Sequence, residues 1–145
     1  MIRHLLPCSA VTLAAALAFA PTASAQDVAT TRADIEATVG GVPTFVTQVA
    51  ASALPGLWLQ TKALEFSDDT ALDARTKALI SLAVAAQIPC SYCVWSDTNA
   101  ARANGATDEQ IAEAVAIAGL TRNWSTNFHG LQVDMETFRM EMGGE

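Results

Sequence analysis

Two cysteines separated by two residues are the part of the sequence best suited to chemistry. Cys90 and Cys93 stand in the run IPCSYC, directly after Pro89. This spacing allows the two thiols to form a disulfide, and it allows one sulfur to attack a substrate while the other resolves the product. Since Pro89 breaks the preceding helical pattern, Cys90 is predicted at the start of the next helix. Unpaired backbone N–H groups and the positive end of the helix dipole favour a thiolate there.

Two other uses of the cysteine pair are weighed against redox chemistry. A structural zinc site needs four protein ligands. The exported chain contains only three cysteine or histidine residues, which are Cys90, Cys93 and His129. We therefore expect neither a metal nor a cofactor. A disulfide that closes so short a loop removes little entropy from the unfolded chain, so it would stabilise the fold only slightly. Redox function is favoured, and a permanent structural disulfide stays open as an alternative.

The first 25 residues have the pattern of a secretory signal peptide. Arg3 precedes an apolar run that is too short for a comfortable membrane span. Ala23 and Ala25 form the small-residue pattern of a cleavage site, so we place cleavage before Gln26. The protein is therefore expected to be exported, to the periplasm or out of the cell, where two thiols can be oxidised to a disulfide.

Cleavage of this signal peptide would leave an acidic chain of single-domain size. Removing 25 of the 145 residues leaves 120, and we expect residues 26–145 to form one domain. Loss of the positive charge of Arg3 changes the formal net charge from −7 to −8. An acidic domain without basic runs is poorly suited to nucleic acid or to an anionic membrane surface, so neither is expected as a partner.

Hydrophobic spacing and capping residues predict an all-α protein of six to seven helices. Thr107, followed three residues later by Gln110, is a capping box, and Gly105 is placed to end the helix before it. Gly40 and Gly41 end the first helix in the same way. The predicted helices cover residues 31–39, 44–52, 55–65, 71–87, 90–104, 107–128 and 131–142.

The helix that leads to the cysteines is apolar nearly all round. Its run LISLAVAAQIP contains no charged residue over residues 79–89. Such a helix is usually buried on more than one side, by its own domain or by a second copy of the chain. A homo-oligomer is therefore expected.

The sequence around the cysteines resembles the carboxymuconolactone decarboxylase-like superfamily, and specifically its alkyl hydroperoxidase D-like branch. The resemblance covers residues 70–128 best. It rests on the apolar helix leading into CSYC, the following helix with small residues, and the run GATDEQIAEAV. It implies an all-α fold, assembly as a trimer or hexamer, and reduction of peroxides by the CxxC pair, which a thiol or disulfide electron donor then regenerates. The decarboxylase branch acts on a lactone and lacks the cysteine pair.

Two positions depart from the pattern of that branch. The pattern is CxxCxxxH with a glutamate twelve residues before the first cysteine, and here Asp97 and Ala78 occupy the two positions. Asp97 lies four residues after Cys93 and shares its helix face. Its carboxylate can accept the thiol proton, but its negative charge disfavours the thiolate, so a slower thiol is expected at Cys93. The resemblance implies that Cys93 attacks the substrate. The helix dipole favours Cys90. Because the histidine and glutamate that would form a proton relay to Cys93 are absent, we favour Cys90 as the attacking sulfur.

Residues farther along the chain complete the set of candidates. His129 is a possible substitute base, although a lone histidine is more often a cap or a surface group. Folding of the helix 107–128 back across the CxxC helix would place His129 near the thiols. Trp95 and Trp124 are interpreted as core or pocket-wall aromatics.

The sequence thus predicts a thiol-dependent antioxidant oxidoreductase. Its candidate catalytic residues are Cys90 and Cys93, with Asp97 as a relay substitute and His129 as a further candidate. The substrate would be a small peroxide or a disulfide. Two alternatives stay open: a non-catalytic binding or assembly module with a structural disulfide, and a cofactor-free lyase of the decarboxylase type.

Overall fold

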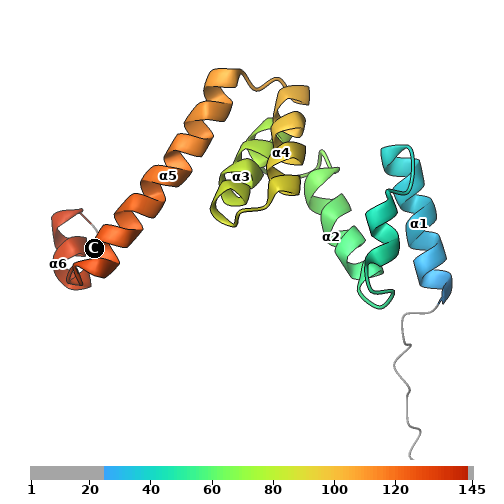
Figure 1. Ribbon diagram of the computed structural model, residues 1–145, viewed down its shortest axis with the longest axis horizontal. Coiled ribbons are helices and arrows are strands. Elements are labelled where there is room, and N and C mark those ends of the chain that lie inside the picture. Colours follow the sequence, from blue (N-terminus) through green and yellow to red (C-terminus); the bar gives the residue numbers. More distant parts are fainter. Residues whose placement is uncertain (1–24, 144–145) are drawn as a thin grey trace, which may run out of the picture. The chain divides into compact units, whose positions relative to one another are not determined.

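The computed structural model describes residues 25–143, and this part of the chain is helical with no strand (Figure 1). The predicted signal peptide lies outside the described residues except for Ala25. The elements are α1 (Ala25–Val39), the 3-10 helix η1 (Thr44–Gln48), α2 (Leu54–Glu65), α3 (Ala74–Gln87), α4 (Ser91–Ala103), α5 (Asp108–Gly130) and α6 (Met135–Glu141). The prediction of an all-α fold is confirmed. None of the helices in the described range is long and apolar enough to cross a membrane.

The chain divides into two compact units, one ending at Leu59 and the other beginning at Gln60. The prediction of one domain over residues 26–145 stays a prediction, and each unit is described by itself. In the first unit, Ile35, Val46 and Leu54 form a small buried cluster. The indole N–H of Trp58 donates a hydrogen bond of 2.6 Å to Asp34 Oδ2. This unit therefore has a core and a polar cross-link of its own.

The second unit is built on the packing of α3 against α4 and α5. Small side chains make this close packing possible: Ala78 and Ala85 of α3 and Ala101 of α4 are buried, and Leu82 is only 1% exposed. The guanidinium of Arg122 on α5 donates hydrogen bonds to Gln87 at the end of α3, to the side chain at 2.8 Å and to the carbonyl oxygen at 3.3 Å. Together these contacts hold the end of α3, from which the chain passes to the cysteines.

Several predicted helix ends are confirmed by their caps. Thr107 and Gln110 form the reciprocal capping box that begins α5. Gly40 and Gly105 each follow a helix with a φ of +81°, a conformation that glycine adopts without strain. The residue types at these ends determine the backbone locally, which is why the sequence was sufficient to place them.

Other predicted boundaries are wrong. The helix expected over 44–52 is only a 3-10 turn, Thr44–Gln48, followed by turns. The helix expected from residue 71 begins at Ala74, because the Asp73 side chain accepts a hydrogen bond from the Thr76 N–H and so serves as the N-cap. The last helix is shorter than residues 131–142, because Asp134 caps a new helix in the same manner.

Candidate functional site

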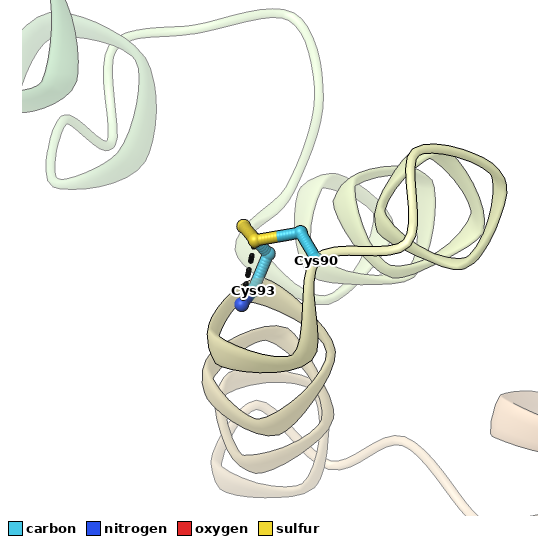
Figure 2. The surroundings of a disulfide bond; sticks show 2 residues. All are labelled: Cys90 and Cys93. Carbon is cyan, nitrogen blue, oxygen red and sulfur yellow. Dashed lines mark hydrogen bonds between the residues drawn. A yellow bond between two sulfur atoms is a disulfide. The ribbon is translucent and has the colours of Figure 1, made fainter.

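The two cysteines form a disulfide at the beginning of α4 (Figure 2). Cys90 is the N-cap residue of this helix, and its sulfur accepts a hydrogen bond of 3.2 Å from the backbone N–H of Cys93. The Cα atoms of the pair lie 5.3 Å apart. The Cys90 sulfur therefore takes the place of the side-chain oxygen that usually caps a helix. A thiolate at this atom would keep the same hydrogen bond and the favourable end of the helix dipole.

The connection between α3 and α4 holds Cys90 in position. The N–H of Ile88 donates to the Val84 carbonyl at 3.2 Å, and the N–H of Cys90 donates to the Ala85 carbonyl at 3.4 Å. The backbone on both sides of Pro89 is thus hydrogen-bonded to the last turn of α3. Since Ala85 is itself buried, Cys90 is fixed relative to the core of the second unit.

An open groove of about 600 Å³ begins at Cys90 and follows α4. The residues that α4 contributes recur at helical spacing and therefore form a stripe along one face. Its floor and walls include Ala85, Val94 and Trp95, and Arg102 lies at the far end. Cys93 is not among the lining residues, so a molecule in the groove would meet the Cys90 sulfur first. The expectation that Trp95 is a pocket-wall residue is confirmed.

Asp97 lies on the other side of α4, one helical turn after Cys93. It is half-buried, and this burial raises the pKa of its carboxyl group above the ordinary value of 3.8. The negative charge of Glu65 at the end of α2 raises the same pKa further. A carboxylate with a raised pKa is a better proton acceptor than an ordinary aspartate, and Asp97 lies four residues after Cys93 on the same helix. Sequence reasoning missed Glu65, because the effect of its charge on Asp97 depends on tertiary packing.

The structure does not bring every candidate residue to this site. Ala78, at the family's glutamate position, is a core residue of α3 with 5% exposure. His129 is exposed in the last turn of α5. α5 packs mainly against α3, not across α4. Arg122 of α5 binds Gln87 at the end of α3, and from Arg122 the helix continues for about 10 Å before it reaches His129. Over residues 25–143, no hydrogen bond or ion pair links the His129 side chain to the cysteines or to Asp97.

Metal binding has no matching donor set in the described part of the chain. Over residues 25–143, no group of three or more histidine, cysteine, aspartate or glutamate side chains is arranged to hold an ion. The chemistry that the arrangement itself offers is thiol–disulfide exchange at the Cys90 sulfur, which lies at the groove, with Asp97 one helical turn after Cys93.

The fold and the cysteine pair define an all-helical protein of the alkylhydroperoxidase type. Residues 52–134 match the model of the carboxymuconolactone decarboxylase family, and the chain belongs to this family. A solved structure, the alkylhydroperoxidase AhpD core from Rhodospirillum rubrum, is 34% identical and superimposes with a TM-score of 0.67, over 79% of this chain and 87% of that one. A curated relative from Paracoccus denitrificans, uncharacterized protein 4 in the cox locus, is 37% identical over 83 residues, which are 57% of this chain and 74% of the relative.

The raised pKa of Asp97 predicts a stability change with a defined pH dependence. A carboxyl group whose pKa is higher in the folded than in the unfolded state stabilises the fold when protonated, and this contribution is lost as the pH rises through the folded-state pKa. Asp97→Asn should therefore increase the free energy of unfolding at pH 7. The gain should shrink as the pH falls through the raised folded-state pKa towards 3.8, the ordinary value, and should be absent below 3.8, where the wild-type carboxyl group is protonated in both states.

Urea titrations of both proteins at a series of pH values measure this difference. Asp68→Asn is the matched control, because Asp68 is exposed and the substitution makes the same chemical change away from α4. A gain for Asp97→Asn that does not depend on pH would contradict the account of Asp97.

Proposed function

We propose that the protein is a thiol-dependent peroxidase or disulfide oxidoreductase that cycles between the Cys90–Cys93 disulfide and the dithiol. The observation that carries this proposal is the position of the pair: a disulfide at a helix N-terminus with one sulfur at the end of an open groove. Family membership and the 34% identity to an alkylhydroperoxidase core support the same chemistry. The position of Cys90 in the groove favours it as the sulfur that meets the substrate.

The proposed peroxide reaction uses both sulfurs. The Cys90 thiolate attacks the terminal oxygen of a hydroperoxide, the O–O bond breaks, and the product leaves as an alcohol after taking up one proton. Cys90 is then a sulfenic acid. The Cys93 sulfur attacks it, the S–O bond breaks, and the hydroxide leaves as water with the proton from Cys93. In this proposal Asp97, one helical turn after Cys93, accepts that proton and passes it on. A dithiol donor reduces the resulting disulfide by exchange and is itself oxidised to a disulfide.

Assembly of several copies is a second part of the proposal. Large apolar side chains on α3 and α5 are left exposed within one chain, among them Ile80, Val84, Ile117 and Leu120. Large apolar side chains that one chain leaves exposed on neighbouring helices are typical of protein–protein contacts, so we propose that copies of this chain cover them. Sedimentation equilibrium should give a mass several times that of one chain. A monomer at micromolar concentration would contradict this proposal.

Export of the protein stays a prediction. In an oxidising compartment the Cys90–Cys93 disulfide would persist unless a dedicated donor reduced it. The mass of the protein isolated from its native cells would show whether cleavage occurs before Gln26.

Substitution of each cysteine tests the catalytic proposal. In the reduced protein, Cys93→Ser should still react with peroxide and accumulate a sulfenic acid at Cys90, because only the resolving thiol is missing. Cys90→Ser should form little sulfenic acid. Both variants, and the double variant, should lose at least about 90% of steady-state peroxidase turnover, since two sulfurs are needed to complete the cycle. Dimedone labelling followed by mass spectrometry measures the sulfenic acid.

Ser96→Ala is the matched control on the same helix, because Ser96 is exposed and outside the groove. Sulfenic acid that forms only at Cys93 would contradict the assignment of Cys90. A double variant with undiminished peroxide and disulfide activity would contradict the function. A double variant that still converts a lactone at an unchanged rate would point to the decarboxylase type of chemistry.

A further inference from the structure

The far end of the groove carries a charge that the peroxidase reaction does not use. We propose that the groove binds a long-chain monocarboxylic acid, with its carboxylate at Arg102, its apolar chain over Val94 and Trp95, and the distal half of the chain at Cys90. The inferred substrate class is fatty acid hydroperoxides. The binding site stands on the geometry of the groove alone, whereas the reduction of such a hydroperoxide rests on the proposed function.

The middle of the groove is suited to a hydrocarbon chain. Trp95 is 72% exposed, and Val94 and Pro89 are exposed beside it. Exposed large apolar side chains next to one another indicate a surface that is covered by a ligand or a partner. The volume of about 600 Å³ falls in the range of small-molecule sites.

The charge of the groove selects a carboxylate. Arg102 is the only charged residue among those that line it, in a chain with a formal net charge of −7. Its Nε and Nη2 atoms donate hydrogen bonds of 3.2 and 3.0 Å to the same oxygen of Asp108, Oδ1. A guanidinium has five N–H donors, so this single oxygen leaves several of them for another acceptor. The side chains of Arg102 and Asp108 are 55% and 81% exposed. An exposed ion pair contributes little free energy, so a ligand carboxylate can replace Asp108 at the guanidinium.

The spacing of the two ends sets the length of the ligand. From Cys90 to Arg102 the helix rises by about 18 Å. A fatty acid whose hydroperoxide lies in the distal half of its chain spans that length, whereas hydrogen peroxide occupies only one end. When such a hydroperoxide reacts, the Cys90 thiolate takes its terminal oxygen and the O–O bond breaks. The hydroxy fatty acid leaves with one proton, and Cys93 then closes the disulfide with release of water.

Binding of oleate to the oxidised protein tests the site without any turnover. Calorimetric titration should give one bound oleate per chain and a weaker affinity for oleyl alcohol, which has the same chain but no charge. Arg102→Gln should weaken oleate binding by up to about fivefold, the size of an exposed ion pair, and should leave the affinity for oleyl alcohol within about twofold. Asp108→Asn should strengthen oleate binding, because it removes the competing carboxylate.

Arg139→Gln is the matched control, because Arg139 is an exposed arginine on α6 that does not line the groove. Trp95→Ala should weaken both ligands. The proposal is overturned if oleate does not bind, if it binds no better than the alcohol, or if Arg102→Gln and Arg139→Gln have the same effect. The outcome is separable from the proposed function: loss of oleate binding leaves reduction of hydrogen peroxide in place, and an inactive cysteine pair leaves oleate binding in place.

Discussion

The hydrogen bond from the Cys93 backbone N–H to the Cys90 sulfur is the interaction on which the site depends. It makes a sulfur atom the N-cap of α4, so the redox pair and the start of the helix are one feature. The Cys90 N–H is in turn bound to the Ala85 carbonyl of α3. The packing of α3 on α4, through small buried side chains, thereby determines where the reactive sulfur lies.

α4 separates two chemical environments on its two sides. The groove side presents Cys90, a hydrocarbon surface and Arg102. The other side presents Cys93 with Asp97, and the charge of Glu65 acts on Asp97 there. This division is the basis of the proposal that Cys90 contacts the substrate and that Cys93 gives up its proton to Asp97. A carboxyl group with a raised pKa thus stands where the related pattern has a histidine, and the proposal that Asp97 takes over the proton transfer rests on this.

Local features of this structure were predictable from the sequence, and tertiary ones were not. The glycine after α4 and the capping box of α5 act through bonds within a few residues, so Gly105 and Thr107 were sufficient to locate them. The apolar segment at 44–52 was interpreted as a full helix, because its hydrophobic content does not distinguish a 3-10 turn from an α-helix. Glu65 and Asp97 are far apart in the sequence, and no spacing rule links them. The groove was missed for the same reason, since its floor comes from α3 and its wall from α4.

The reduction potential of the Cys90–Cys93 disulfide tests the central claim most directly. The protein would be equilibrated in a series of redox buffers, and its free thiols trapped and counted by mass spectrometry. An N-capping sulfur whose thiolate is stabilised by the helix should give a potential between about −120 and −270 mV, the range of known dithiol catalysts. A potential below about −300 mV, typical of structural disulfides, would contradict a redox cycle at this site.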